Sequence, residues 1–229
     1  MKSASTFYRQ YGKRIFDFLV SAVALILLSP LLVVTAVLVR LLLGGPVLFR
    51  QQRAGQHKRS FTILKFRTMT NACDAEGNLL SDSARLTTFG KFLRATSLDE
   101  LPELWNIVVG EMSLVGPRPL LLRYNSSYSE RESQRFELLP GLTGWAQING
   151  RNTLAWDDRL ELDVHYVENC SFAFDLKILF QTVFKVLRRE NVHVNTDLIE
   201  SYLDEERQHI RGWGRNALLI QPLPLLGSE

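Results

Sequence analysis

The sequence has little cysteine, and its cysteines and histidines form no metal-ligand pattern. Cys73 and Cys170 are its two cysteines, and they lie far apart without forming a CxxC pair. A disulfide framework and a cysteine-based zinc site are therefore not indicated, and a reducing compartment is consistent with this usage. The four histidines share no ligand spacing either, so we expect them in surface or structural positions.

The signatures of several enzyme classes are also missing. There is no P-loop, GxGxxG, HExxH or Ser-His-Asp pattern that would argue for an NTPase, a dehydrogenase, a zinc protease or a serine hydrolase. The net charge of +3 and the pI near 8.9 are mild. Nucleic acid usually demands a clustered basic face, so this balance favours anionic headgroups or phosphorylated substrates as partners.

Charge is absent from one long stretch, Phe18 to Val39, which is apolar throughout apart from a few small polar residues. About 20 apolar residues suffice for a helix to cross a bilayer core. The run is too long for the apolar region of a signal peptide, and no cleavage site follows it. We therefore expect a retained membrane element in residues 1–45.

Ser29 and Pro30 lie near the middle of this run and predict a break there. Pro30 cannot donate a hydrogen bond to the carbonyl of Ile26, and the Ser29 hydroxyl can help satisfy the freed backbone. Basic residues flank the run on both sides, and such residues prefer the cytoplasmic face. A re-entrant helix-break-helix hairpin keeps both flanks there. A kinked spanning helix is the alternative, and hydropathy alone slightly favours it.

The rest of the chain reads as a small α+β domain, mostly helical, at residues 46–195, followed by a C-terminal extension of unknown role at 196–229. Residues 47–51 and 61–66 predict a short β-hairpin. Helices are expected after Ser97, at 156–167 and at 174–189. The last has an apolar face that suits either the core or a membrane interface.

Asp99 and Glu100 follow Ser97 in a pattern that fits a helix capping box, which is their simplest structural explanation. Pro102 weakens that explanation, because its missing amide would fall beyond the first-turn positions where proline costs little. Arg94 and Arg118 lie close by in sequence. Arginines beside carboxylates suggest a site for Mg²⁺ and phosphate.

Lys65 and Arg67 follow each other at strand spacing, which places them on one face of the second predicted strand. Phosphate contact and a solvated strand face are equally good explanations of this pair.

Four motifs in order resemble those of the bacterial sugar transferase family. They are KFRTM at 65–69, SLDEL at 97–101, VGPRP at 115–119 and PGLTGWAQ at 140–147, behind a membrane helix interrupted by Ser-Pro. Each is weak alone, but the ordered set is specific and covers roughly residues 10–195. The short form of this family, little more than a catalytic domain, is the most similar.

The resemblance implies a monotopic phosphoglycosyl transferase. Such an enzyme moves sugar-1-phosphate from a UDP-sugar to undecaprenyl phosphate, releases UMP, and makes the first lipid-linked sugar of a surface glycan such as an exopolysaccharide, lipopolysaccharide or glycoprotein glycan. It also implies the re-entrant helix, the cytoplasmic face of the bacterial inner membrane, both termini in the cytoplasm, inner-membrane lipids as neighbours and no nucleic acid. The oligomeric state stays open, a homodimer being one option.

By the same resemblance, Asp99 is the nucleophile and a ligand of Mg²⁺ or Mn²⁺, and Glu100 assists by metal or proton handling. Phosphate and substrate contacts are expected from Arg94, Arg118, Lys65, Gln147, Asn149, Arg151 and Asp163. A non-catalytic membrane-anchored scaffold and a membrane-bound phosphohydrolase are the rival hypotheses. The sugar and the pathway cannot be read from the sequence.

Overall fold

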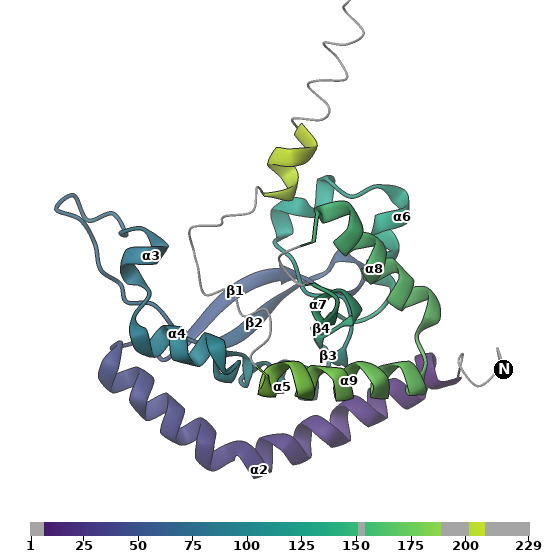
Figure 1. Cartoon of the computed structure of the whole chain (residues 1–229), viewed down its shortest axis with the longest axis horizontal. Helices are drawn as coiled ribbons and strands as arrows, with labels where there is room; N and C mark the ends of the chain where they lie inside the picture. Colours follow the sequence, from purple (N-terminus) through teal and green to yellow (C-terminus); the bar gives the residue numbers. More distant parts are fainter. Residues whose placement is uncertain (1–6, 151–153, 189–201, 209–229) are drawn as a thin grey trace, which may run out of the picture.

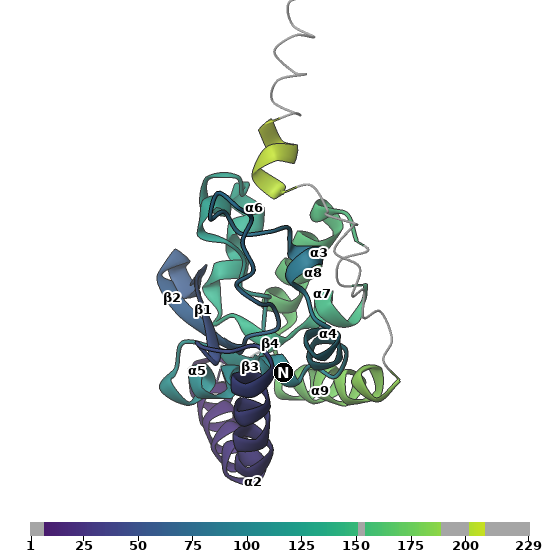
Figure 2. The ribbon, with the colours of Figure 1, turned by 90° about the vertical axis from the view of Figure 1, so that its left-hand side faces the viewer.

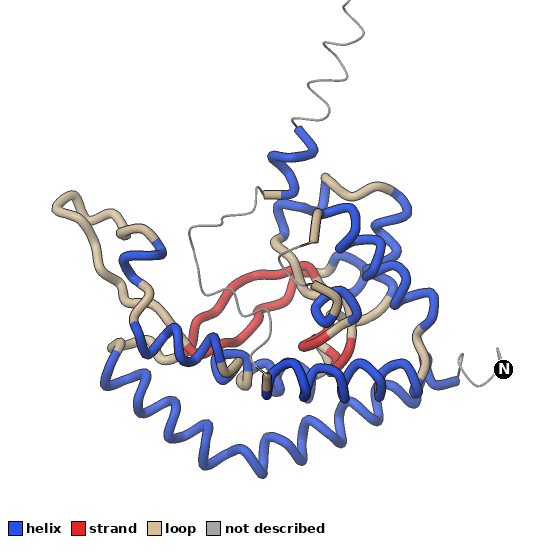
Figure 3. The backbone as a smooth tube through the Cα atoms, viewed as in Figure 1, coloured by secondary structure: helices blue, strands red, loops and turns tan. Residues whose placement is uncertain are grey.

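The computed structural model describes residues 7–150, 154–188 and 202–208. The predicted α+β class is confirmed in its coarse form: a mostly helical molecule with two small two-stranded sheets and one long N-terminal helix (Figures 1 and 3). Of the C-terminal extension at 196–229, the structure describes only 202–208, of which 203–208 are helical.

In chain order the elements are η1 Tyr8–Gly12, α2 Lys13–Leu42, β1 Leu48–Ala54, η2 Gln56–Lys58, β2 Ser60–Phe66, α3 Asp82–Arg85, α4 Thr88–Ala95, η3 Leu98–Glu100, α5 Glu103–Val109, β3 Ser113–Val115, η4 Leu122–Ser126, α6 Glu130–Ser133, η5 Gln134–Glu137, β4 Gly141–Thr143, α7 Trp145–Ile148, α8 Trp156–Asn169 and α9 Phe172–Leu187. The β-hairpin is confirmed as β1 and β2, paired antiparallel from Leu48 opposite Phe66 to Ala54 opposite Ser60. The two helices expected near 156–167 and 174–189 are α8 and α9.

The long helix α2 is continuous through Pro30 and is bent rather than broken (Figure 1). The hydroxyl of Ser29 donates a hydrogen bond of 2.8 Å to the carbonyl of Ile26, the acceptor that Pro30 leaves without an amide. The predicted compensation by Ser29 is therefore confirmed, whereas the expected interruption of the helix is wrong. Together η1 and α2 run for 35 residues and are long and apolar enough to cross a membrane.

Both halves of α2 pack against the rest of the protein. Phe16, Leu25 and Leu28 contact the main core, which includes residues of β2, α5, β3 and α9. Val39 and Leu43, farther along, pack with Phe66 and Leu93 in a second core. Both halves of α2 therefore contact the folded domain. The bend between them is exposed, with Ile26 and Leu27 each 72% accessible.

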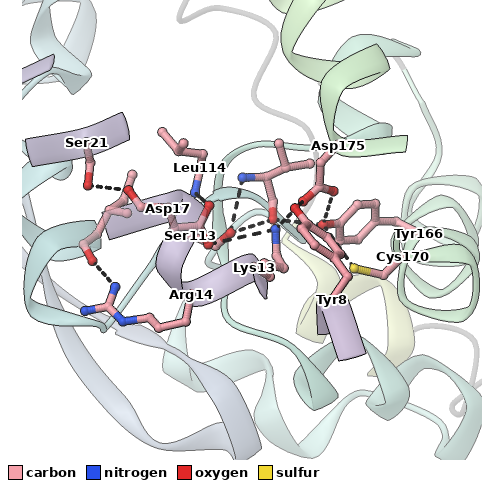
Figure 4. Close-up of polar contacts among 12 residues, drawn as sticks. Tyr8, Lys13, Arg14, Asp17, Ser21, Ser113, Leu114, Tyr166, Cys170 and Asp175 are labelled. Carbon is pink, nitrogen blue, oxygen red and sulfur yellow. Dashed lines mark hydrogen bonds and ion pairs between the residues drawn. The ribbon is translucent and has the colours of Figure 1, made fainter. Parts of the chain in front are cut away.

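The N-terminal part of α2 is joined to β3 and α9 by a buried polar cluster (Figure 4). Asp175 accepts hydrogen bonds from Lys13 and Tyr8, each at 2.6 Å, and from Tyr166 at 2.7 Å. Asp17 accepts the backbone amide of Leu114 in β3 at 3.2 Å. These contacts fix where α2 leaves the folded domain.

Three amphipathic helices, α4, α5 and α9, lie at one level next to α2 (Figures 1 and 2). Each buries one side, through Leu93, Ile107 and Ile178 respectively. Their other sides expose large apolar side chains, namely Phe92, Trp105, Val109, Phe180, Val183 and Phe184. The core-packing explanation of the last helix is therefore confirmed. The helix α9 also presents an apolar surface, for which a membrane interface stays a prediction.

Candidate active site

The turn that carries Asp99 is not a helix N-terminus of the predicted kind. Ser97 has a left-handed backbone, with φ of 55°, and its side chain makes no capping hydrogen bond. A short 3-10 turn, η3, follows it, and α5 begins only at Glu103 after Pro102. The capping-box explanation is wrong because the chain changes direction at Ser97. Pro102 is the N-cap of α5, where its missing amide breaks no helical hydrogen bond.

Lys65 of β2 lies between two carboxylates of this turn. Its ammonium is 2.6 Å from Glu100 and 3.0 Å from Glu103. Arg118 approaches Glu100 from the other side at 3.1 Å. Burial would raise the pKa of Glu100, but Arg118 and Lys65 outweigh it and lower that pKa to about 2. Burial raises the pKa of Glu103 to about 7, with Lys65 opposing the rise.

Asp99 is buried but forms no ion pair with any part of the described chain. Burial raises the pKa of its carboxyl group, and the charge of Glu100 adds to the effect, while Lys65 and Arg94 oppose it. The positive charges of Lys65 and Arg94 therefore influence Asp99, although neither side chain forms an ion pair with it. A carboxylate held this way is available for nucleophilic attack or for a cation brought by a substrate.

Arg94 enters from the last turn of α4. Its Nε donates to the hydroxyl of Thr68 at 3.1 Å. The close approach that allows this depends on Gly90 in the same helix, since a Cβ there would meet the carbonyl of Thr68 at 1.8 Å. The KFRTM segment and the helix before Asp99 are thus packed backbone to backbone.

Arg118 is positioned by the parallel pair β3 and β4. Gly116 and Gly141 face each other so closely that a Cβ on Gly141 would lie 2.0 Å from the Gly116 amide nitrogen. Arg135 donates to the carbonyl oxygen of Arg118 at 2.7 Å and pairs with Asp163 at 2.8 Å. Asp163 is therefore buried and holds Arg135, which in turn contacts the backbone of Arg118; its contact with substrate stays a prediction.

Gln147 and Asn149 lie on α7 and at its end. The amide group of Gln147 donates to Leu142, and its buried oxygen lacks a hydrogen-bond partner among the described residues. Asn149 donates to the carbonyl of Trp145 and lines an open pocket of about 440 Å³ with residues of α9. Arg151 lies outside the described residues.

Arg67 and Lys65 have different partners, although the backbone pairing of the hairpin continues past Phe66: the amide of Arg67 donates to the carbonyl of Val47 at 3.0 Å. The guanidinium of Arg67 donates to the carbonyls of Leu43 and Gly45, where α2 ends. Lys65 instead pairs with Glu100 and Glu103. That the two residues share one face, and that they contact phosphate, stay predictions.

A divalent cation would find one free carboxylate here. No group of three or more His, Cys, Asp or Glu side chains suited to a metal occurs within the described ranges. Mg²⁺ often binds through one or two carboxylates plus substrate phosphates, so a protein-only cage is not required. The buried and unpaired Asp99 fits such an ion; Glu100, already paired twice, fits it less well.

Glu103 and Arg135 were not among the predicted site residues. Glu103 follows Asp99 and Glu100 closely in the sequence, and this cluster of three acidic residues is the signal that could have identified it as a site residue. Arg135 lies in a stretch with no motif, and nothing in the sequence connects it to Arg118. Its role depends on a contact between η5 and the segment after β3.

Known proteins and a family model match this chain over most of its length. The family model described as bacterial sugar transferase matches residues 8–189. An uncharacterized sugar transferase, EpsL of Bacillus subtilis, is 51% identical over 180 residues, which are 79% of this chain and 89% of that protein.

Two further relatives carry more specific names. The UDP-glucose:undecaprenyl-phosphate glucose-1-phosphate transferase of Klebsiella pneumoniae is 43% identical over 76% of this chain, which spans 39% of that longer protein. The exopolysaccharide production protein ExoY of Sinorhizobium fredii is 39% identical over 75% of this chain and 84% of its own length. The chain belongs to the bacterial sugar transferase family.

Proposed function

We propose that this protein is an undecaprenyl-phosphate sugar-1-phosphate transferase that takes its sugar phosphate from a UDP-sugar. The observation that carries the proposal is the arrangement around Asp99. A buried carboxylate without an ion pair lies beside Lys65, Arg94 and Arg118, whose charges suit a diphosphate. One relative named for a reaction of this kind and another named for exopolysaccharide production support it.

In the first step an oxygen of Asp99 attacks the phosphorus that carries the sugar. The bond from that phosphorus to the oxygen bridging to UMP breaks, UMP leaves with the electron pair, and an aspartyl phosphosugar remains. In the second step a phosphate oxygen of the lipid attacks the same phosphorus and displaces the Asp99 carboxylate. Two steps allow one site to serve a soluble donor and a membrane acceptor in turn.

The cations of the site offset charge during both steps. An anionic nucleophile and a diphosphate repel each other, so Lys65 and Arg118 stabilise the approach and the departing UMP. Glu100 keeps both of them in place through its ion pairs. Mg²⁺ or Mn²⁺, held by Asp99 together with phosphate oxygens, would supply further charge neutralisation.

The membrane arrangement that fits this chemistry is a re-entrant α2. Contact of both halves of α2 with the same domain supports it, as does the apolar layer of α4, α5 and α9 beside it. A helix that dips and returns would hold the site at the level of lipid headgroups on the cytoplasmic side. For the test, single cysteines at Ser3 and Gln56 are placed in a Cys73→Ser background, because Cys73 is exposed. An impermeant reagent should label both from one side; labelling from opposite sides contradicts re-entry.

The activity test is UMP release from a panel of UDP-sugars, with and without undecaprenyl phosphate. We expect release that depends on the lipid and stops in Asp99→Asn. Asp158→Asn, an exposed aspartate of α8, is the matched control. Release without lipid, giving free sugar phosphate, would identify a phosphohydrolase, and no release with any donor would favour a scaffold. Full turnover by Asp99→Asn would contradict the covalent mechanism alone.

A further inference from the structure

A third arginine, besides Arg94 and Arg118, lies on the side of the β-hairpin that faces the carboxylate site. Arg53 pairs with Phe61 across the sheet, and paired residues project from the same face. Side chains alternate along β2, so Phe61, Ile63 and Lys65 also share that face. Phe61 and Ile63 are buried in the main core and Lys65 binds Glu100. Arg53 therefore points toward the same side as the site.

The backbone around Arg53 is joined to the segment that carries Arg118. Arg53 forms a β-bridge with Leu121, and the amide of Ala54 donates to the carbonyl of Leu120 at 3.0 Å. Ala54 and Arg118 also line one water-sized cavity of about 10 Å³. Burial and, to a smaller extent, the nearby positive charge of Arg118 lower the pKa of the Arg53 guanidinium to about 10, while Tyr124 and Glu103 oppose the shift.

The charges of these two arginines are not balanced. Arg118 has Glu100 as its partner, but no carboxylate of the described chain pairs with Arg53. The contact of Arg53 is with the neutral amide oxygen of Gln51, at 2.5 Å. Its Nε is buried and has no hydrogen-bond partner among the described residues. A buried, unpaired donor beside a like charge costs free energy unless an anion completes the arrangement.

The position of Arg53 along the hairpin indicates which anion. β1 starts shortly after α2 and runs away from it (Figure 1). At about 3.3 Å per residue, Arg53 lies some five residues, or about 16 Å, along the strand from Leu48. In the proposed function the lipid phosphate would reach the site from the membrane, and a soluble nucleotide would reach it from the opposite side. Arg53 is therefore placed for the nucleotide.

We propose that Arg53 is a further substrate-binding residue, which with Arg118 holds the phosphate group that remains on the nucleotide when the sugar phosphate is transferred. This inference rests on the proposed function. The nucleotide phosphate gains negative charge as its bond to the transferred phosphorus breaks, and two guanidinium groups stabilise that charge with paired hydrogen bonds.

The test compares Arg53→Gln and Arg53→Lys with Arg59→Gln. Arg59 lies in the same hairpin, is exposed and loses the same charge, so it serves as the matched control. We expect Arg53→Gln to raise the KM for UDP-sugar and weaken product inhibition by UMP about tenfold or more, with the KM for undecaprenyl phosphate unchanged. Arg53→Lys should give values between those of wild type and Arg53→Gln, since lysine keeps the positive charge but lacks the planar guanidinium group that forms two parallel hydrogen bonds. An unchanged UMP inhibition, or a loss confined to the lipid KM, would overturn the proposal.

Binding of UMP also gives a readout that does not need turnover. UMP should raise the Tm of the wild-type protein and of Arg59→Gln, and should do so much less for Arg53→Gln. If Arg53→Gln does not fold, the same measurement on Arg53→Lys decides. A wild-type protein that binds UMP but transfers nothing would contradict the proposed function and leave this comparison valid, whereas equal Tm shifts in all variants would overturn the role of Arg53.

Discussion

The ammonium group of Lys13, in the first turn of α2, lies 2.6 Å from the carboxylate of Asp175 in α9, and both are buried. Lys13 belongs to the basic flank whose positive charge predicts a cytoplasmic position for this end of the helix. Its neighbour Arg14 donates to the carbonyls of Ile107 and Val108, where α5 ends. Part of this flank thus joins the membrane helix to the folded domain instead of facing lipid headgroups.

Replacing Lys13 should therefore destabilise the whole molecule. Lys13→Met leaves Asp175 charged and buried without its cation, which typically costs about 3–5 kcal/mol. The measurement is thermal and denaturant unfolding in detergent. Arg131→Ala is the control, because Arg131 makes exposed ion pairs with Glu161 and Glu168 and should cost less than about 1 kcal/mol. Equal effects of the two substitutions would contradict the structural role of Lys13.

Glu103 should make stability depend on pH. Its pKa is raised from 4.5 to about 7 in the folded protein. As pH rises, the unfolded state therefore loses this proton at a lower pH than the folded state does. The stability it contributes is complete below about pH 4.5 and is lost as pH rises to about 7.

Glu103→Gln imitates the protonated form at every pH. Relative to wild type it should gain stability between pH 5 and pH 8, by up to about 3 kcal/mol, in Tm measured across that range. Glu161→Gln, at an exposed carboxylate, should show no gain of this kind. A Glu103→Gln variant that is less stable than wild type at pH 8 would mean that the ionised pair with Lys65 is net favourable.

A methyl group between β3 and β4 should displace Arg118. In Gly141→Ala the new Cβ would meet the backbone of Gly116 at 2.0 Å and of Thr143 at 2.3 Å, and backbone cannot rotate away. We expect a loss of stability of at least about 2 kcal/mol and UMP release reduced more than tenfold. Gly45→Ala, where nothing lies within 4 Å of the added Cβ, should keep both near the wild-type values. A fully active Gly141→Ala would contradict this account of Arg118.

The described part of the C-terminal extension should be a docked element. Leu203 is fully buried against Tyr124, Trp156 and Leu160. Arg207 pairs with Glu132 at 2.6 Å and with Asp157. Leu203→Asp should release residues 202–208, because a carboxylate cannot enter that apolar contact without a partner.

Hydrogen exchange measures the release of this segment. Amides of 203–208 should exchange at least tenfold faster in Leu203→Asp than in wild type, and the first turn of α8 should lose protection with them. Glu205→Gln is the control, since Glu205 is exposed and its contact with Arg123 is long, at 3.5 Å. Unchanged exchange in Leu203→Asp would contradict docking. The family model ends at residue 189, so UMP release should persist in this variant.

Local patterns determined much of the fold. Alternating strand residues around a polar turn predicted β1 and β2, and apolar spacing predicted α8 and α9, because these elements bury the faces that their sequences show. The segment after Ser97 differs. Its apolar residues fit one long helix, but a left-handed Ser97 and a proline inside the pattern divide it into a turn and the shorter α5.

Ordered motifs in the sequence alone identified the family and named Asp99, Glu100, Arg94, Arg118 and Lys65 as a set. Only the tertiary structure decided which of these residues pair with one another and which carboxylate stays unpaired. Lys65 and Arg118 pair with Glu100 and leave Asp99 free, because β2, η3 and the segment after β3 meet around that turn. Sequence spacing cannot encode which carboxylate a cation reaches. That choice depends on the packing of elements far apart in the chain, and the pKa of each acid follows from it.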